Sequence, residues 1–370
     1  MSWRLLMVKD TMNWWNIEFG DEEADATSLA IRMKNISQGE LTLEFEQKLA
    51  DILEVPYVVC TTSGSMALLM AYMALGIKPG DEIIIPNRTF IATAHAALIL
   101  GAKVVLVDTK EDIPIIDVSK IREKITKKTK VIVPVHLNGR SADMKEINKI
   151  AEENELYIVE DTAQGLLSKN EDGFLGTQSN IGCFSLGMTK LMSTGQGGFV
   201  VTKNKQLYEK LKLLRTHGVI DPQKNYPYNE IGFNFRYNDV LASVGLIQLK
   251  KIRKHINHVQ EVYQKYETAF KEFSFIKLIP VKVSRGEIPL WVEVLSKERE
   301  KIIVFLNSHN ILTRYFLPNL NLSPHLENKG EFPNSKIYEE QGFYLPCGPN
   351  QPLENIDMVI NILKMYNKNR

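Results

Sequence analysis

Short runs of consecutive apolar residues recur along the N-terminal half of the chain. They are rich in valine and isoleucine, and they lack the strict alternation of apolar and polar positions that marks a half-exposed strand. Such runs are typical of β-strands that are buried on both faces of a sheet. The pattern predicts seven strands: YVVC (57–60), EIIIP (82–86), KVVLVD (103–108), VIVPV (131–135), YIVED (157–161), IGCFS (181–185) and GFVVT (198–202).

Segments with helical periodicity separate most of these runs. SMALLMAYMALG (65–76) and MKEINKIAEENE (144–155) are two examples. Alternating strands and helices predict a parallel or mostly parallel sheet that is covered by helices on both faces. The expected fold class is therefore α/β, with a mostly parallel seven-stranded sheet flanked by helices.

The pattern changes after residue 202. A helix is expected up to Gly218, followed by a polar loop (219–232) and a helical stretch from Asn238 to Phe273. That stretch is longer than an average globular helix, so it is expected to bend or to bridge two domains. A strand (290–295) and a helix (297–309) indicate a smaller C-terminal α/β domain. The expected division is an N-terminal segment (1–20), a large domain (21–250) and a small domain (251–370).

Composition and charge disfavour several classes of function, among them nucleic-acid binding. Of 370 residues, 44% are hydrophobic and 24% are charged, and the net charge of +1 disfavours a nucleic-acid-binding role. No apolar run approaches the roughly 20 residues that span a membrane, and the N-terminus does not resemble a signal peptide. Three widely spaced cysteines (Cys60, Cys183 and Cys347) favour a reducing cytoplasm, and no cysteine or histidine cluster predicts a metal site.

Polar residues gather where the predicted strands end. In open α/β sheets, ligands bind at the carboxyl ends of strands, so these groups are expected to converge. Each group alone has an ordinary structural explanation, such as a helix cap, a turn residue, a core aromatic or a lysine at the edge of a loop. The groups are TTSGS (61–65), NRTF (87–90), HLNG (136–139), EDTAQ (160–164) and LGMTK (186–190).

Together these groups match what pyridoxal phosphate needs. A hydroxyl-rich helix N-terminus can bind its phosphate, and an aromatic side chain can stack on its ring. A glutamine can hydrogen-bond a ring substituent, an aspartate can pair with the protonated ring nitrogen, and a lysine can form a Schiff base. The competing phosphate motifs, GxxxxGK[ST] before a helix and GxGxxG after the first strand, are absent from the sequence.

The order and spacing of these motifs resemble the DegT/StrS family of pyridoxal-phosphate-dependent sugar aminotransferases. The resemblance covers most of the chain from about residue 15 and implies the fold-type I, aspartate aminotransferase-like architecture. The matching segments are 36–50, 62–108, 134–144, IVEDTAQG (158–165), CFSLGMTKLMSTGQGGFV (183–200), 214–218 and 231–249, with weaker matches at 310–318 and 343–348.

The resemblance implies a role for each matching residue. Lys190 corresponds to the lysine that binds the cofactor as a Schiff base, and Asp161 corresponds to the partner of the ring nitrogen. Gln164 is expected near the ring hydroxyl, and Phe90 is expected to stack on the ring. The remaining implied contacts are to the phosphate: Gly64, Ser65 and Ser185 from this subunit, and Asn234 from the neighbouring subunit of a homodimer with two shared active sites.

The implied reaction is a transamination. L-glutamate would leave its amino group as pyridoxamine phosphate, and a keto sugar, expected to be linked to a nucleotide, would receive it for surface polysaccharide or related glycan synthesis. Lys190, with a pKa lowered by burial from about 10.4, would transfer the proton while Asp161 keeps the ring nitrogen protonated. Candidates for contacts with anionic substrate groups, each of which could instead form a surface ion pair, are Arg88, Arg140, His217, Arg236 and Arg314.

Some positions differ from the usual family pattern and put the substrate, more than the cofactor, in question. They are Ser-Gly-Ser (63–65) in place of Gly-Thr, Leu186 and Gly187 in place of aromatics, Gln196 in place of glutamate, and Asn87 and Arg88 in place of proline and a small residue.

Other functions stay open to different degrees. Related dehydratases replace the lysine, typically with histidine, so Lys190 argues against that reaction. A smaller phosphorylated keto compound remains an alternative acceptor. The complete set of Asp161, Gln164 and Lys190 disfavours a non-catalytic binding or regulatory protein. The missing glycine motif disfavours a nucleotide-dependent oxidoreductase.

Overall fold

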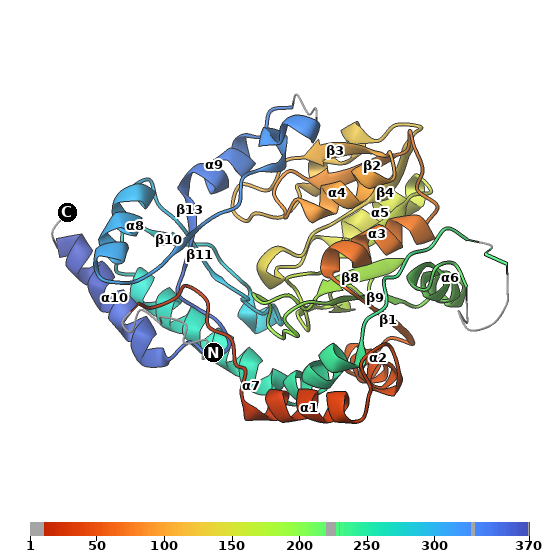
Figure 1. Ribbon diagram of the computed structural model, residues 1–370. Coiled ribbons are helices and arrows are strands. Elements are labelled where there is room, and N and C mark those ends of the chain that lie inside the picture. The colour runs from red at the N-terminus through yellow and green to blue at the C-terminus, as the bar shows by residue number, and fades with distance from the viewer. Residues whose placement is uncertain (1–10, 220–226, 229, 327–329, 369) are drawn as a thin grey trace.

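The seven strands expected from the sequence form one sheet in the computed structural model, which describes residues 11–219, 227–228, 230–326, 330–368 and 370. The strands are β1 (Tyr57–Thr61), β2 (Glu82–Pro86), β3 (Lys103–Val107), β4 (Thr129–Ile132), β5 (Tyr157–Asp161), β8 (Ile181–Ser185) and β9 (Gly198–Thr202). Their order is β1-β9-β8-β5-β4-β2-β3 (Figure 1). β9 is antiparallel to both neighbours and the other pairs are parallel, so the mostly parallel α/β sheet is confirmed.

β4 differs most from its expected range of 131–135, because it begins two residues earlier, at Thr129, and ends three residues earlier. β4 ends at Ile132, whereas the apolar run continues to residue 135. Pro134 lies in that run, and proline has no N–H group with which to extend the ladder. Beyond Ile132 the pairing with β5 continues only as an isolated parallel bridge between Val135 and Asp161: Asp161 N–H donates to the Pro134 carbonyl at 2.9 Å, and His136 N–H donates to the Asp161 carbonyl at 3.0 Å.

Helices cover both faces of the sheet, as the alternation predicted. Ile83 and Ile85 of β2 pack in one apolar cluster with α3 (Gly64–Ala74), α4 (Ala92–Ile99) and α6 (Lys205–Arg215). Ile84 points to the opposite face and packs with α5 (Met144–Glu153), because successive side chains of a strand alternate between faces. On that opposite face, β1, β8 and β9 pack against α2 (Glu40–Leu53).

A helix of 32 residues, α7 (Asp239–Phe270), connects the large sheet to the C-terminal region. At one end, Asp239 accepts hydrogen bonds from the N–H groups of Gly39 and Thr42 beside α2, at 2.8 and 2.9 Å. Near the other end, the Tyr266 hydroxyl donates to the carbonyl of Pro346 at 3.0 Å. The helix α1 (Asp21–Arg32) packs along α7. The domain division expected after residue 250 falls inside α7, and this boundary stays a prediction.

The C-terminal region is built on a second, antiparallel sheet. Its strands are β10 (Lys277–Leu278), β11 (Val292–Leu295), β12 (Arg314–Tyr315) and β13 (Gly342–Leu345), in the order β10-β11-β13-β12. Three helices flank it: α8 (Arg299–Ser308), α9 (Pro333–Gln341) and α10 (Leu353–Lys368) (Figure 1). The expected smaller α/β region is therefore present. A short hairpin, β6 (Lys169–Asn170) and β7 (Gly173–Phe174), completes the strands of the described residues.

Residues 11–20 lie along the C-terminal region. Met12 forms a parallel bridge with Ile311, and Trp15 forms one with Cys347. This path brings the N-terminal tryptophans next to the C-terminal sheet. Within the described ranges, no helix is long and apolar enough to cross a membrane, and no group of three or more His, Cys, Asp or Glu side chains is suited to a metal ion.

Candidate active site

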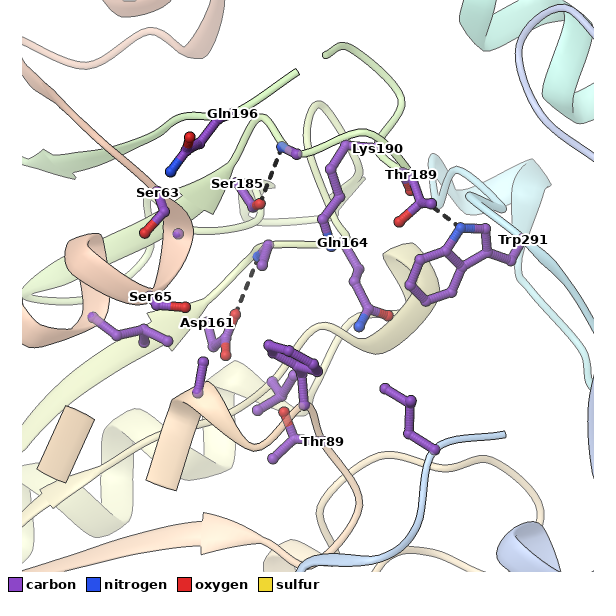
Figure 2. A pocket seen from close by; sticks show the side chains of 18 of the residues that line it. Ser63, Ser65, Thr89, Asp161, Gln164, Ser185, Thr189, Lys190, Gln196 and Trp291 are labelled. Carbon is purple, nitrogen blue, oxygen red and sulfur yellow. Dashed lines mark hydrogen bonds between the residues drawn. The ribbon is translucent and has the colours of Figure 1, made fainter. Parts of the chain in front are cut away.

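A cavity of about 340 Å³ lies at the carboxyl ends of the central strands, between the large sheet and the C-terminal region. Figure 2 shows side chains from both parts pointing into it. The polar groups that follow β1, β2, β5 and β8 therefore converge. The cavity is lined by eight of the residues selected from the sequence: Gly64, Ser65, Phe90, Asp161, Gln164, Ser185, Lys190 and Arg314.

Lys190 occupies the loop after β8, and its side chain extends into the cavity (Figure 2). Burial lowers the pKa of Lys190 to about 8, the positive Arg314 adds to this shift, and the negative Asp161 opposes it. Two tryptophans hold the peptides before it. Trp15 Nε1 donates to the Met188 carbonyl at 3.0 Å, and Trp291 Nε1 donates to the Thr189 carbonyl at 3.2 Å. The loop thus presents an amine that can lose its proton near neutral pH.

Asp161 ends β5 and is 4% exposed. Its Oδ2 accepts a hydrogen bond from Thr93 Oγ1 at 2.8 Å, and its Oδ1 accepts one from Ala163 N–H at 3.1 Å. Burial raises the pKa of this carboxyl, whereas the two donors and the nearby Lys190 lower it. A buried carboxylate with fixed donors is suited to hold a cationic ring nitrogen in place. Thr93, on α4, was not selected from the sequence.

Gln164 is oriented by a neighbour that the sequence analysis did not assign a role. Its Oε1 accepts a hydrogen bond from Asn138 N–H at 2.9 Å, which leaves the amide NH₂ for the cavity. Asn138 has a φ of 57°. Its side chain donates to the Trp291 carbonyl at 2.9 Å and accepts from the Trp291 N–H at 2.6 Å. One asparagine therefore links Gln164 to the tryptophan beside Lys190.

The N-terminus of α3 forms the opposite end of the cavity. Ser63 caps the helix, because its Oγ accepts a hydrogen bond from Met66 N–H at 3.2 Å. Gly64 allows the helix to approach β8 closely, since a Cβ at this position would lie 2.8 Å from Cβ of Ser185. The free N–H groups of a first helical turn, with the hydroxyls of Ser65 and Ser185, suit a phosphate group.

The comparisons with known proteins agree with this geometry. A sequence profile described as the DegT/DnrJ/EryC1/StrS aminotransferase family matches residues 18–364. The chain belongs to this family. The GDP-perosamine synthase of Caulobacter vibrioides is 32% identical over 88% of this chain and 90% of the relative. The UDP-4-amino-4,6-dideoxy-N-acetyl-beta-L-altrosamine transaminase of Campylobacter jejuni is 30% identical over 95% of this chain and 96% of the relative.

A solved structure supports the same assignment. DesV of S. venezuelae matches with a TM-score of 0.88 and 28% identity, over 93% of this chain and 94% of that chain. The resemblance found in the sequence is confirmed, and the protein is an aminotransferase whose cofactor is pyridoxal phosphate. Its cavity residues fit this cofactor: a lysine of lowered pKa, a buried carboxylate, an amide, the half-exposed ring of Phe90 and a helix N-terminus for the phosphate.

Two arginines considered as substrate contacts in this aminotransferase face the interior instead. Arg88 is 4% exposed and donates to the Leu317 carbonyl at 3.0 Å. Arg140 is 1% exposed, pairs with Glu293, and donates to the Pro280 carbonyl at 2.7 Å. Their positions correct the sequence-based expectation, because both guanidinium groups join the large sheet to the C-terminal region and neither lines the cavity.

Three other candidates lie outside the cavity of this chain. His217 and Asn234 are exposed, and Asn234 forms a bridge with Thr216. Arg236 is partly buried and forms a bridge with Thr61 of β1. Part of the loop expected at 219–232 is outside the described residues. The roles of His217, Asn234 and Arg236 stay predictions.

One wall of the cavity is aromatic, and no motif of the sequence pointed to it. Trp14, Trp291 and Tyr344 line the cavity, and their ring centroids lie 5.1 to 6.5 Å apart. The Arg314 guanidinium lies 5.0 Å from the centre of the Trp14 ring. Trp14 lies in residues 11–20, Trp291 directly precedes β11, and Tyr344 lies in β13, so no local motif marks the wall. The tryptophans of the N-terminal segment were the available signal, since large apolar rings are seldom left exposed without a function.

Proposed function

We propose that the protein transfers the amino group of L-glutamate to a keto sugar linked to a nucleotide, for the synthesis of a surface polysaccharide or related glycan. The observation that carries the proposal is the joint placement of Lys190, Asp161 and Arg314 in one aromatic-walled cavity. The names of the two relatives, a GDP-perosamine synthase and a UDP-amino-sugar transaminase, support the same class of substrate.

Lys190 and Asp161 divide the proton chemistry. Bound pyridoxal phosphate supplies the ring that withdraws electrons from the reacting carbon of the substrate. Lys190 takes the proton from that carbon and returns it, because an amine with a pKa of about 8 is uncharged in roughly a tenth of molecules at pH 7. Asp161 keeps a proton on the ring nitrogen, since its carboxylate is fixed by Thr93 and Ala163.

The aromatic wall and Arg314 are suited to hold the substrates. Among the described residues, Arg314 is the one arginine that lines the cavity, and its forked donors match a carboxylate or a phosphate. The rings of Trp14 and Trp291 present flat apolar surfaces that can pack on the carbon–hydrogen face of a sugar. We assign Arg314 to the anionic groups and the tryptophans to the sugar ring.

The reverse reaction tests this function. GDP-perosamine, or a UDP-linked 4-amino-4,6-dideoxy sugar, is supplied as amino donor with 2-oxoglutarate, and L-glutamate formation is measured. We expect glutamate from at least one nucleotide sugar, and none with Lys190→Ala. A protein that exchanges amino groups with L-glutamate but accepts only phosphorylated amino sugars without a nucleotide would favour the smaller acceptor instead.

We also propose a cytoplasmic homodimer in which Asn234 reaches the neighbouring site, which its exposed position permits. Mixing two inactive variants tests the sharing of sites. In a dimer of Lys190→Ala with Asn234→Ala, one site contains both mutations and the other contains neither. Recovery of activity on mixing supports a site shared between subunits. Two inactive variants that stay inactive after co-folding would place Asn234 outside the neighbouring site.

A further inference from the structure

Asn87 follows β2 directly and is fully buried. Its Nδ2 donates to Oδ1 of Asn321 at 2.9 Å, and its own Oδ1 accepts from the Asn321 N–H at 2.9 Å. Its carbonyl accepts from the Leu320 N–H at 2.9 Å. Both the side chain and the main chain of Asn87 therefore hydrogen-bond to a segment that is distant in the sequence. This segment, residues 314–322, is called the wall segment.

Arg88 contacts the same wall segment. Its Nη1 donates to the Leu317 carbonyl at 3.0 Å and lies 3.4 Å from Oδ1 of Asn319. Its guanidinium centre lies 4.4 Å from the centre of the Phe316 ring. Among the ion pairs of the described residues, none joins Arg88 to a carboxylate. A buried cation without such a partner depends on carbonyl oxygens and an aromatic face, so it fixes the segment that supplies them.

The Asn87–Arg88 pair lies between two walls of the cavity. Thr89 and Phe90, which follow directly in the chain, line the cavity on the cofactor side. Arg314 and Leu317 of the wall segment line it on the substrate side. The pair contacts Leu317 directly, and Arg314 lies three residues before it in β12, where it pairs with Tyr344 of β13.

We propose that Asn87 and Arg88 are positioning residues that hold Arg314 and Leu317 at the substrate side of the cavity without touching substrate themselves. The proposal rests on the proposed function for the identity of the substrates. Its core, the placement of Arg314 relative to Lys190, can be tested without any substrate.

The variants separate an effect on the position of Arg314 from a general loss of protein stability. Arg88→Met keeps a long side chain on Phe316 and removes the charge and the donors, whereas Arg88→Lys keeps a charge and a donor. Asn321→Ala removes the acceptor of Asn87 Nδ2, and Asn321→Asp keeps it. Tyr263→Phe serves as the stability control, because its hydroxyl accepts the Val281 N–H at 2.9 Å outside the cavity.

The first measurement is the rate at which the full chain, freed of cofactor, captures pyridoxal phosphate at different pH values. Capture needs an uncharged Lys190, so the midpoint of the curve of rate against pH reports the pKa of its amine. Asp161 raises this pKa and Arg314 lowers it. Arg314→Gln removes a positive charge and moves the midpoint upward. We expect Arg88→Met to move the midpoint in the same direction. The double variant Arg88→Met/Arg314→Gln should move it no further than Arg314→Gln alone, because the effects of two residues do not add when one acts through the other.

The second measurement is steady-state kinetics with L-glutamate. Arg88→Met and Asn321→Ala should raise KM for L-glutamate by about ten-fold while kcat changes by less than about two-fold. A displaced wall segment weakens substrate binding more than it alters the chemical step. Arg88→Lys and Asn321→Asp recover part of the loss. Backbone hydrogen exchange at Leu320 becomes faster in Arg88→Met and Asn321→Ala and not in Tyr263→Phe.

Two outcomes overturn the proposal. An unshifted capture midpoint and unchanged KM in Arg88→Met, with a lower Tm like that of Tyr263→Phe, would make the pair purely structural. Additive midpoint shifts in the double variant would show that Arg88 does not act through Arg314. Failure of every nucleotide sugar in the reverse reaction rejects the proposed function alone, since the capture profile and hydrogen exchange involve no sugar.

Discussion

Nζ of Lys190 lies 5.4 Å from the centre of the Trp291 ring. The same indole donates to the carbonyl of Thr189, the residue before the lysine. A cation near an aromatic face is favoured in its charged form, so Trp291 opposes the burial that lowers the pKa of Lys190. Trp291, which directly precedes β11, thus anchors the peptide before the lysine and lies beside its amine, so the two halves of the molecule meet at the reacting group.

Removal of the amine should abolish the reaction and spare binding of the aminated cofactor. We expect Lys190→Ala to lower the transamination rate by about 10³-fold or more, because both the covalent attachment and the proton transfer are lost. Pyridoxamine phosphate, which needs no lysine attachment, should still bind in equilibrium dialysis. Lys203→Ala, at an exposed lysine after β9, is the control. Near-wild-type turnover by Lys190→Ala would remove Lys190 from the mechanism.

The pH dependence of cofactor capture should respond to Asp161 with a definite sign. Capture by the wild-type chain should rise with pH with a midpoint at about 8, where half of the Lys190 amines are uncharged, and level off at higher pH. The negative Asp161 favours the charged amine, so Asp161→Asn should move this midpoint to lower pH. The rate is followed by visible absorbance as the cofactor binds. A midpoint that stays in place or moves upward would contradict the assigned interaction between the two side chains.

The sheet could be predicted because its strands are buried on both faces. All five residues of β2 are buried, and so are all five of β9, so the central residues of each strand, Ile83–Ile85 and Phe199–Val201, appear in the sequence as consecutive apolar residues. Helix starts could also be predicted from capping residues. Ser63 before α3 and Asn238 before α7 each accept a capping hydrogen bond. The range of β4 was less exact, because the apolar run continues past Ile132 into residues that form only an isolated bridge with β5.

The cofactor side of the cavity was predictable, whereas on the substrate side the sequence pointed to Arg314 but not to the tryptophans. Lys190, Asp161 and Gly64 lie in contiguous motifs at strand ends, and a parallel sheet brings such ends together. The opposite wall joins Trp14, Trp291 and Arg314, whose contacts depend on the packing of the C-terminal region. Arg88 was assigned to substrate because its acceptor, the carbonyl of Leu317, is 229 residues away along the chain. Local sequence cannot distinguish such an arginine from one that binds a ligand.

Thr93 should control the pH at which Asp161 becomes protonated. Its hydroxyl donates to Asp161 Oδ2 at 2.8 Å and lowers the carboxyl pKa against the larger effect of burial. In Thr93→Val the pKa of Asp161 should rise further. Activity that needs the carboxylate is lost as pH falls through its pKa, so the acid limb of kcat/KM for L-glutamate should move to higher pH.

Thr177→Val is the matched control for the loss of a threonine hydroxyl. Its Oγ1 donates to the Phe174 carbonyl at 2.8 Å, outside the cavity. The control should keep the wild-type acid limb. An unchanged acid limb in Thr93→Val as well would mean that the Thr93 hydroxyl does not tune Asp161.

The close approach of α3 to β8 should set the cofactor's affinity. A Cβ on Gly64 would lie 2.8 Å from Cβ of Ser185, so Gly64→Ala forces apart the two elements that hold the phosphate. Gly64 has no positive φ, so the effect comes from crowding alone. We expect a loss of about 1–3 kcal/mol in the free energy of unfolding, and weaker binding of pyridoxal phosphate in a fluorescence titration.

Two further variants decide whether crowding is the cause. Gly20→Ala, at a glycine whose nearest added contact would be 4.0 Å away, should leave affinity and stability near wild type. Ser185→Gly removes the atom that the methyl group added by Gly64→Ala would meet, at the cost of one hydroxyl in the cavity. The double variant Gly64→Ala/Ser185→Gly should therefore recover stability relative to Gly64→Ala while keeping a reduced affinity. Equal stability of the single and double variants would show that the contact between α3 and β8 does not limit this site.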